Sequence, residues 1–472
     1  MSKVKEYAGM TKNKLMLYTF VALLVIAIIT IISWWDLVAV DVMTGEPTGW
    51  PLGLALLGSV LVAVGIAVGT DTLISKVAVD SQLNTLSAAV YGLIVALSYS
   101  LGLPTMRTQS ITPLVAPDAL VFVALITVVG IVIFKKLSSM KGRKFVNPAA
   151  AAKLIVMLPF LGTLLLPQDH LWDPNWAAEG GMGMGTGLGI PSLAGPIGYE
   201  VIGGNGLDSF SNYLAGCYSS PSAVIPTVTT ENDMFQLLFM QKFHGWPGGA
   251  SSLVVIIVGL ALFLIARKYI KWRITGAYLG TVALMAVLLH FAYPGGDLVL
   301  RLMFELFMGS SIFLAFFMAT DPATTPVTHM GQLVFGVGLG VLTVLIQTYM
   351  GFLGGSILAL LVMNLASPFL DRVGKLKPTT ETKEPKLPKA KSFTPEKVKT
   401  YDCIRCGACM RVCCHKLSPI LIKQAFDKMD FEKMSKLNAD YCTGCGHCSF
   451  VCPSRIDLMG TVLRAKAMLR QE

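Results

Sequence analysis

Long apolar runs are the feature that most constrains what this chain can fold into. About ten stretches are long enough to cross a bilayer, which takes roughly 20 apolar residues each. Only 14% of the 472 residues are charged, whereas about a quarter are charged in soluble proteins. The sequence therefore predicts an all-α polytopic membrane domain over residues 1–372. Its expected helices lie near residues 17–34, 51–69, 84–103, 117–134, 148–166, 251–267, 275–292, 299–318, 331–348 and 352–370.

The basic residues indicate how the chain threads the membrane. With a cytoplasmic N-terminus, the connections at 135–144 and 267–273 fall inside, and both are strongly basic. Segment 167–250 falls outside, with seven acidic residues against the single Lys242. We predict a prokaryotic inner-membrane protein whose N-terminus and C-terminal tail are cytoplasmic. The net charge of +10 lies in loops and one tail, not on a basic face with interleaved aromatic residues, which argues against a nucleic-acid partner.

Five ionisable side chains interrupt the apolar runs: Lys153, His290, Arg301, Glu305 and Asp321. Such groups are costly in lipid, so each is a candidate for function. Arg301 and Glu305, four residues apart, are expected to pair near the outer interface. Asp321 is expected to cap the turn before Pro322, and Lys153 to extend toward the interface.

Nine of the ten cysteines lie between Cys403 and Cys452, in two runs of equal spacing. In two-cluster ferredoxins, three closely spaced cysteines of each run bind one [4Fe–4S] cluster, and the fourth binds the other cluster. We therefore predict that residues 401–472 form a small α+β ferredoxin-type domain with two [4Fe–4S] clusters. The first cluster is assigned to Cys403, Cys406, Cys409 and Cys452, and the second to Cys413, Cys442, Cys445 and Cys448.

A pair of zinc sites is the alternative, although zinc usually binds CxxC pairs. Cys414 stands where Pro usually follows the first run, either as an extra buried thiol or as a substitute ligand. Arg405, Arg411 and His415 bring positive charge to the first run. They either raise the potential of the first cluster or form a solvated basic face.

Residues 373–400 contain four Pro, eight Lys and three Glu. This composition predicts a solvated, semi-extended linker that lets the following domain reach different docking positions beneath the membrane. Its lysines suit anionic lipid headgroups as well as water.

Several patches resemble the D subunit of the Rnf electron-transport complex and its relative, the B subunit of the sodium-pumping NADH:quinone reductase. They are Asn147-Pro148-Ala149, Trp272-Arg273-Ile274, Tyr278-Leu279-Gly280, Phe317-Met318-Ala319-Thr320-Asp321-Pro322, Gly331-Gln332 and Met363-Asn364. The tail resembles the ferredoxin module of the Rnf C subunit. Membrane and cluster modules that are usually on separate subunits are thus fused here.

The resemblance implies FMN, linked through its phosphate to a threonine of the outer segment. Thr230 best fits the acceptor and Thr229 is the second choice, although Val228 stands where the family has Gly. The alternative is that these are ordinary β-branched loop residues. The resemblance also leaves room for a second flavin. Independently, electrons cannot cross about 30 Å of hydrocarbon in one step, so a carrier within the membrane is expected.

Together these features predict a subunit of a redox-driven ion translocase, an oxidoreductase that is inactive without its partner subunits. It would pass electrons between cytoplasmic clusters and a membrane flavin and move Na⁺ or H⁺. The expected partners are other subunits of an Rnf-like complex, a ferredoxin or another low-potential donor, and membrane lipid. The alternatives are a non-pumping flavin and iron–sulfur conduit, and a membrane-anchored ferredoxin whose helices only dock other proteins.

Overall fold

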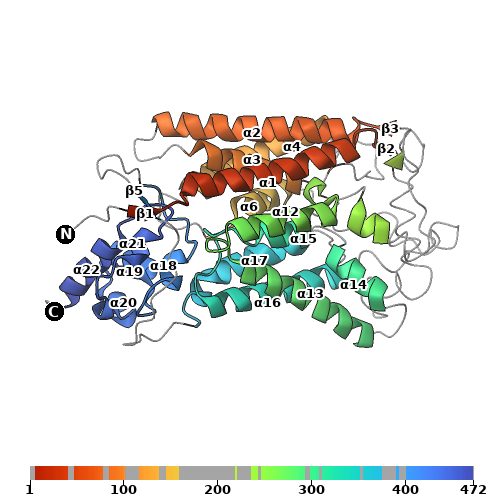
Figure 1. Ribbon diagram of the computed structural model, residues 1–472. Helices are drawn as coiled ribbons and strands as arrows, with labels where there is room; N and C mark the ends of the chain where they lie inside the picture. Colours follow the sequence, from red (N-terminus) through yellow and green to blue (C-terminus); the bar gives the residue numbers. More distant parts are fainter. Residues whose placement is uncertain are drawn as a thin grey trace.

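An elongated helical body carries a small helical domain at one end in the computed structural model (Figure 1). The structure describes residues 6–40, 47–77, 84–99, 101, 116–137, 145–158, 218–219, 235–242, 246–292, 298–307, 311–350, 355–374, 390–392 and 400–470. Thr229 and Thr230 lie outside these described residues, as does most of segment 167–250.

The body is built from helices that run mostly along its length. They are α1 (Lys12–Ser33), α2 (Leu52–Val77), α3 (Thr85–Ser98), α4 (Asp118–Val129) continued by η1 (Gly130–Leu137), α6 (Pro148–Met157), η3 (Gln236–Met240), η4 (Pro247–Gly249), α12 (Ser252–Ile265), α13 (Trp272–Ala292), α14 (Leu298–Phe307), α15 (Ser311–Phe313) continued by η5 (Leu314–Met318), α16 (His329–Met350) and α17 (Gly355–Leu370).

The lengths of these helices show at least five apolar spans. α1, α2, α4 with η1, α13 and α16 are each long and apolar enough to cross a membrane, and α14 with α15 and η5 forms a bent pair. The apolar helices α3, α6, α12 and α17 have between 10 and 16 described residues. Each of the ten predicted stretches therefore contains helix, but ten complete spans are not confirmed.

Large apolar side chains are exposed on the outer surfaces of several helices. Leu61 of α2 is 65% exposed, Leu264 of α12 78%, and Phe369 of α17 67%. Exposed apolar surface on this scale suits lipid better than water, and it accompanies a core of buried Ala, Leu, Val and Phe side chains.

Polar residues at the starts of the helices explain where several of them begin. Asn147 caps α6 by accepting the N–H groups of Ala149 and Ala150, and Pro148 fills the first helical position. Thr11 accepts the Lys14 N–H at the start of α1 in the same way. The Asn147-Pro148-Ala149 patch thus has a local structural reason in addition to its family resemblance.

Glycines allow α13 and α16 to pack closely. A Cβ atom at Gly336 would lie 2.7 Å from the Ala277 side chain, and one at Gly340 would lie 2.8 Å from that of Thr281. Two glycines four residues apart let helix backbones approach in membranes, where dispersion contacts drive helix association. This seam fixes the position of Tyr278, whose backbone oxygen lies against Gly340.

The small domain is made of short helices and loops. They are α18 (Ala408–Arg411), α19 (Pro419–Phe426), α20 (Phe431–Lys436), η7 (Ala439–Tyr441), α21 (His447–Phe450) and α22 (Leu458–Leu469). The described residues 400–470 form no strand, so the predicted α+β character is not confirmed.

Short strands lie at both ends of the body. β1 (Glu6–Ala8) pairs antiparallel with β5 (Ala390–Ser392), which belongs to the predicted linker. β2 (Val38–Val40) pairs with β3 (Pro47–Thr48) and β4 (Tyr218–Ser219) at the other end. The N-terminal strand therefore holds part of the linker beside the small domain (Figure 1).

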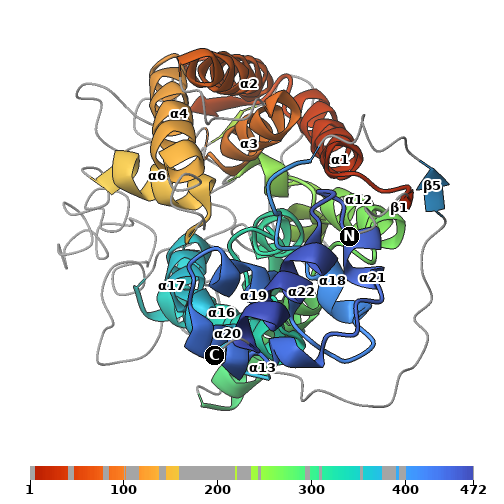
Figure 2. The same cartoon turned by 90° about the vertical axis from the view of Figure 1, so that its left-hand side faces the viewer.

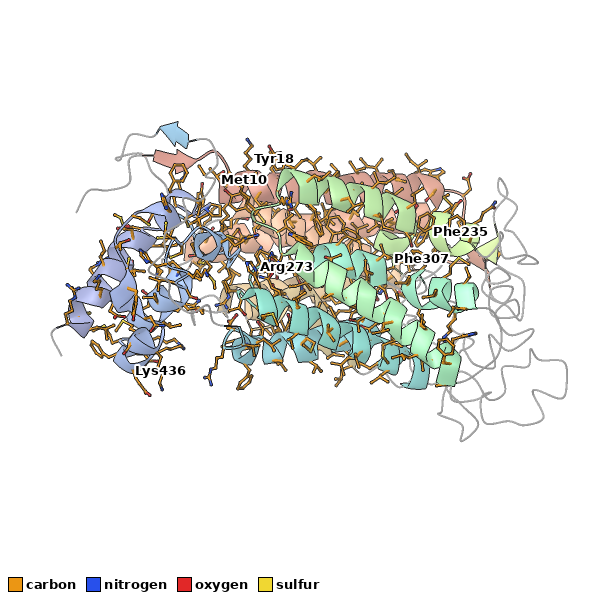
Figure 3. The ribbon with its side chains drawn as sticks, turned by 60° about the horizontal axis from the view of Figure 1, so that its bottom comes forward. Met10, Tyr18, Phe235, Arg273, Phe307 and Lys436 are labelled. Carbon is orange, nitrogen blue, oxygen red and sulfur yellow. The ribbon has the colours of Figure 1, made fainter. Side chains whose placement is uncertain are left out.

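The small domain covers one end of the body, in front of α13, α16 and α17 when the molecule is viewed along its length (Figure 2). Met10 lies at this end, whereas Phe235 and Phe307 lie at the opposite end (Figure 3). The N-terminal strand and the small domain are thus at the same end of the helical body.

Candidate metal centres

Four cysteines surround a first pocket in the small domain, which we call the first cysteine pocket. It is lined by Cys403, Cys406, Cys409 and Cys452, together with neighbours such as Pro453 and Ile420. Cys452 comes from the end of the second cysteine run, whereas the others belong to the first run. The fold therefore brings together the four residues that the sequence assigned to one cluster.

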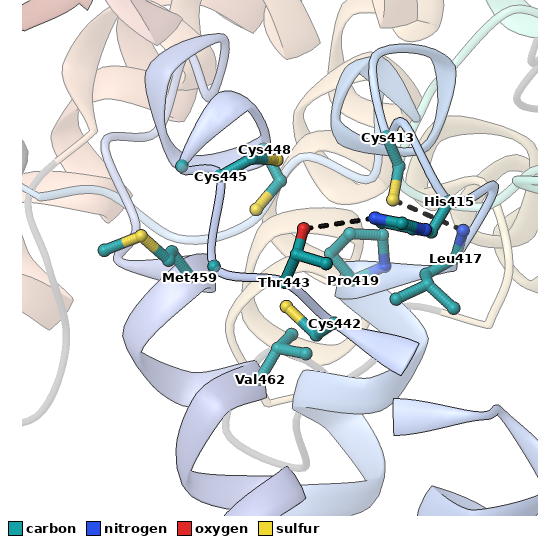
Figure 4. Close-up of a pocket in the computed structure, with 12 residues that line it drawn as sticks. Cys413, His415, Leu417, Pro419, Cys442, Thr443, Cys445, Cys448, Met459 and Val462 are labelled. Carbon is teal, nitrogen blue, oxygen red and sulfur yellow. Dashed lines mark hydrogen bonds between the residues drawn. The ribbon is translucent and has the colours of Figure 1, made fainter. Parts of the chain in front are cut away.

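The second cysteine pocket has the complementary set. It is lined by Cys413, Cys442, Cys445 and Cys448, and Figure 4 shows these four side chains grouped around it. Cys413 comes from the end of the first run. Each pocket thus takes three cysteines from one run and the last cysteine from the other.

Left-handed backbone lets the cysteine loops turn tightly. Gly407 and Gly446, which follow the second cysteine of each run, have φ of 73° and 79°. Gly444 of the second run has φ of 76°, and Arg405 occupies the equivalent position of the first run with φ of 53°. An arginine in this conformation is uncommon, and it marks a position where the side chain has another task.

Backbone amides point at the sulfur atoms. The Arg405 N–H donates to Cys403 Sγ and the Leu417 N–H to Cys413 Sγ, each at 3.3 Å. The Ile456 N–H donates to Cys452 Sγ at 3.5 Å. Such bonds stabilise negative charge on a thiolate or on an attached cluster.

The protein without metal disfavours thiolates at these positions. Burial raises the pKa of Cys448 and of Cys452 to about 12, and it raises the pKa of Cys409 well above its ordinary value. Buried thiols of this kind keep their protons at neutral pH unless a cation stabilises the thiolate. Two sets of four sulfur donors therefore fit a metal centre that brings its own positive charge, as iron–sulfur clusters do.

Cys414 lies beside the second cysteine pocket and does not line it. Its Sγ is 3.2 Å from His447 Nδ1. The ligand atoms of Cys414, Cys445 and His447 all lie within 4.8 Å of one another. Cys414 is half-buried, and its role as an extra thiol or as a substitute ligand stays a prediction.

The first cysteine pocket faces the helical body through a buried ion pair. Arg405 Nη2 lies 2.5 Å from Asp371 Oδ2, and the two side chains are 4% and 7% exposed. Asp371 follows α17 and also accepts the Val327 N–H at 2.8 Å. The Arg405 guanidinium further donates to Gln424 Oε1 at 3.1 Å. The predicted solvated basic face is therefore wrong for Arg405.

Other contacts extend this interface. The Lys12 N–H donates to the Pro453 carbonyl at 2.9 Å, and the Asn13 amide donates to the Tyr401 hydroxyl at 3.1 Å. Arg411 donates to the Lys268 carbonyl. Ile404 and Cys406 pack in an apolar cluster that also includes Leu15, Ala266 and Tyr269 of the body.

Lys271 lies buried beneath this interface. Its Nζ donates to the carbonyls of Pro322 and Thr325 and to Thr325 Oγ1, each at 2.9 Å. Asp321 accepts the Ala323 N–H at 3.1 Å, so it caps the turn as predicted. The sequence pattern marked Lys271 only as a basic loop residue, and nothing local reveals its burial.

A cavity of about 140 Å³ lies in the body next to the interface. Its walls include Tyr269 and residues of two family-like patches, Asn147–Ala149 in the first and Phe317 and Thr320–Pro322 in the second. Because Tyr269 packs against the Cys406 loop as well, one side chain connects the cavity wall to the first cysteine pocket.

The predicted intramembrane residues have defined surroundings. Arg301 and Glu305 form an ion pair at 2.9 Å, with side chains 5% and 2% exposed, so the predicted pairing is confirmed. Lys153 extends into the body, where its Nζ donates to the Ser98 carbonyl at 2.5 Å and lies 4.6 Å from the Trp246 ring centre. The extension of Lys153 toward the interface stays a prediction.

Asp371 and Arg405 were not predicted as a pair. The two residues are separated by the linker, and no local pattern joins them. An alignment of the two cysteine runs places Arg405 opposite Gly444. An arginine where the other run has glycine is the one sequence signal that marks Arg405 as unusual.

Comparisons with known proteins identify both parts of the chain. Residues 6–379 match the NQR2, RnfD, RnfE family, and residues 402–456 match a 4Fe-4S dicluster domain. The D subunit of an ion-translocating oxidoreductase complex from Aeromonas hydrophila subsp. hydrophila is 30% identical over 342 residues, which cover 70% of this chain and 88% of that protein.

Two further relatives differ in the ion that they are named for. The D subunit of a Na⁺-translocating ferredoxin:NAD⁺ oxidoreductase complex from Acetobacterium woodii is 28% identical over 69% of this chain and 83% of that protein. The D subunit of a proton-translocating ferredoxin:NAD⁺ oxidoreductase complex from Clostridium ljungdahlii is 32% identical over 32% of this chain and 44% of that protein.

Proposed function

The chain belongs to the NQR2, RnfD, RnfE family, and from that premise we propose that it is the membrane subunit of a redox-driven ion-translocating complex. It passes electrons between cytoplasmic iron–sulfur clusters and a flavin held by the membrane domain, and it works together with partner subunits. The names of the three relatives support the translocation, with Na⁺ and H⁺ as the candidate ions.

One observation supports this proposal: the first cysteine pocket is docked against the helical body, beside the cavity that residues of the family-like patches line. The Arg405–Asp371 ion pair and the contact between Ile404 and Tyr269 hold the pocket there. A domain that served only as an anchored carrier would need no buried charge pair with the membrane part, because burying two charges costs free energy.

The eight cysteines of the two pockets are the proposed cluster ligands. Cys403, Cys406, Cys409 and Cys452 hold one [4Fe–4S] cluster, and Cys413, Cys442, Cys445 and Cys448 hold the other. Clusters of this type supply one-electron transfer. The protein's own contribution is to bury the sulfur atoms, to direct amides at them and to hold the first cysteine pocket against the body.

A flavin is proposed for the membrane domain. Thr230 is the proposed attachment point for covalent FMN, with Thr229 as the second choice. The cavity beside Tyr269 is the proposed place of a second flavin. Ligand pockets usually have about 300 Å³ or more, so side chains lining this cavity must move to admit a ring system.

The proposed topology follows the basic loops. Ten spans cross the inner membrane, with segment 167–250 outside and with the N-terminus and the small domain in the cytoplasm. The proposed domains are 1–372, the linker 373–400 and the cluster domain 401–472.

Gentle detergent purification followed by reconstitution in vesicles tests the proposal. We expect Rnf-like subunits to co-purify, and we expect redox turnover to move Na⁺ or H⁺ across the vesicle membrane. Flavin-dependent turnover without ion movement would favour the non-pumping conduit. A purified chain without flavin or partners would favour the membrane-anchored ferredoxin.

The flavin site has its own test. Covalent FMN makes the denatured protein band fluorescent, and we expect Thr230→Ala to abolish that fluorescence while Thr229→Ala retains it. The reverse result would assign the attachment to Thr229. Fluorescence in both variants would indicate that the flavin is not attached in this segment.

A further inference from the structure

Three metal-ligating side chains gather at one corner of the second cysteine pocket. The ligand atoms of Cys414, Cys445 and His447 all lie within 4.8 Å of one another. Cys414 Sγ lies 3.2 Å from His447 Nδ1, and the Cys414 and Cys445 thiols also form a hydrogen bond. Cys445 lines the pocket, whereas Cys414 and His447 lie outside its lining. One proposed cluster ligand therefore has a second sulfur atom beside it, which the proposed ligand set leaves unused.

The two cysteine runs meet at this corner. Cys413 lines the pocket as a proposed ligand, and Cys414 follows it directly in the chain. Cys445 comes from the other run, between Gly444 and Gly446, which have φ of 76° and 79°. Left-handed backbone on both sides of Cys445 makes a tight loop that carries its sulfur to the pocket (Figure 4). Each run thus supplies one sulfur atom to the same corner.

Cys445 is the most accessible sulfur donor of the second cysteine pocket. It is exposed, whereas Cys413 and Cys442 are half-buried and Cys448 is buried. Oxidation of cysteine sulfur becomes easier with exposure to solvent. The unused sulfur of Cys414 therefore lies beside the proposed ligand that is most open to loss.

We propose that Cys414 is a reserve ligand of the second cluster and can replace Cys445 on the same iron atom. This inference rests on the proposed cluster ligands and specifies which of them can be exchanged. In the exchange, the bond from iron to Cys445 Sγ breaks and a bond from iron to Cys414 Sγ forms. The Cys414 proton passes to Cys445 Sγ along their hydrogen bond, so the number of electrons on the cluster does not change.

The exchange gives the chain a defence against peroxide. Hydrogen peroxide oxidises the released Cys445 thiol to a sulfenic acid, and water is the other product. The iron atom is meanwhile held by Cys414, so the second cluster keeps four cysteine ligands while its most exposed cysteine is oxidised.

Iron and acid-labile sulfide in the anaerobically purified full chain test the exchange. We expect Cys445→Ser to keep the iron content of the wild type, because Cys414 takes the vacant position. Cys442→Ser is the matched control, since Cys442 does not belong to the group around Cys414. It should lose up to about half of the iron, as one of two four-iron clusters loses a ligand. The double variant Cys414→Ser with Cys445→Ser should lose as much.

Peroxide treatment tests the exchange with Cys445 in place. Before treatment, Cys414→Ser should contain as much iron as the wild type, because Cys445 still serves as the ligand. We expect a dose of hydrogen peroxide that leaves the iron of the wild type intact to remove up to about half of the iron from Cys414→Ser. Iron analysis after removal of the peroxide measures the difference.

Three results would overturn the reserve role. They are equal iron loss in Cys445→Ser and Cys442→Ser, equal iron loss from the wild type and Cys414→Ser in peroxide, and full iron in the double variant. The last result would assign the replacement to His447 or water. A wild type that holds zinc in place of iron would sink the proposed function as well. Full iron in Cys445→Ser, in a complex that moves no ion, would remove the translocation and keep the reserve ligand.

Discussion

Cys452 ends the second cysteine run but lines the first cysteine pocket. The spacing of the cysteines predicted this exchange, because a short loop can supply three corners of a cubane and the fourth must come from elsewhere. The ligand role of each cysteine stays a prediction, and it can be tested one sulfur atom at a time.

Replacing Cys452 tests whether this cysteine belongs to the first cysteine pocket. We expect Cys452→Ser to lose about half of the iron, since one of two four-iron clusters loses a ligand. Iron and acid-labile sulfide analysis on anaerobically prepared protein measures this. Cys414→Ser is the control and should retain all of the iron. Equal losses in the two variants would make Cys414 a ligand, and full iron in Cys452→Ser would refute the exchange.

Arg405 was beyond the reach of local sequence reasoning. Its partner Asp371 lies 34 residues earlier, across the linker, so the cysteine runs can mark Arg405 as unusual but cannot identify its partner. The left-handed backbone costs about 1–2 kcal/mol for a residue other than glycine. The position nevertheless holds Arg, and the buried ion pair with Asp371 is the reason that the structure offers.

Breaking this ion pair should loosen the small domain. Asp371→Asn leaves the Arg405 guanidinium buried without its counter-charge, which costs about 3–5 kcal/mol. Arg405→Gly should cost less, because it removes both the charge and the backbone strain. Hydrogen exchange at the Lys12 amide, which bonds to Pro453, measures the docking.

An exposed ion pair provides the control for this experiment. Lys436 and Glu432 are 64% and 78% exposed, so Glu432→Gln should change the exchange of the Lys12 amide little. If Asp371→Asn also left that exchange unchanged, the ion pair would not be what holds the domain.

At the scale of elements, apolar run length located all ten helical stretches but not their shapes. Hydropathy averages over a window, so it detects the stretch 299–318 without detecting the bend between α14 and α15. A bend of this kind depends on tertiary contacts, which a window of hydropathy does not contain. For the same reason, the short helices α3, α6, α12 and α17 could be located from sequence, whereas their lengths could not.

The seam between α13 and α16 offers a test of packing. Gly340→Ala would place a Cβ atom 2.8 Å from Thr281, and such overpacking typically costs about 1–3 kcal/mol. Gly280→Ala on α13 meets no atom within 4 Å and should be neutral or stabilising, since Ala favours helix by about 1 kcal/mol. Thermal unfolding in detergent compares the two variants, and equal midpoints would contradict the close approach.

At the scale of the whole molecule, the sequence predicted separate membrane and cluster parts and placed both termini on one side. It also predicted a linker that allows different docking positions, whereas the structure has the small domain docked through Asp371 and Arg405. That single position arises from contacts between parts distant in sequence, which composition cannot reveal.

Reporter fusions test the threading of the chain. We expect alkaline phosphatase inserted within 167–250 to be active, and a fluorescent protein fused after Glu472 to be bright in the cytoplasm. An inactive phosphatase at the first position, together with an active one at the C-terminus, would invert the proposed topology.

Under the proposed function, covalent attachment of the docked small domain changes the kinetics of electron transfer to the membrane domain. Two free proteins meet by diffusion, at a rate that falls with dilution, whereas a tethered pair has a fixed local concentration in the millimolar range. Each membrane body therefore carries its own dicluster domain, the proposed electron carrier, in one-to-one stoichiometry. Under the proposed function, competing acceptors in the cell could not draw that carrier away, and scarcity of a soluble ferredoxin donor would slow only the first encounter, not the delivery that follows.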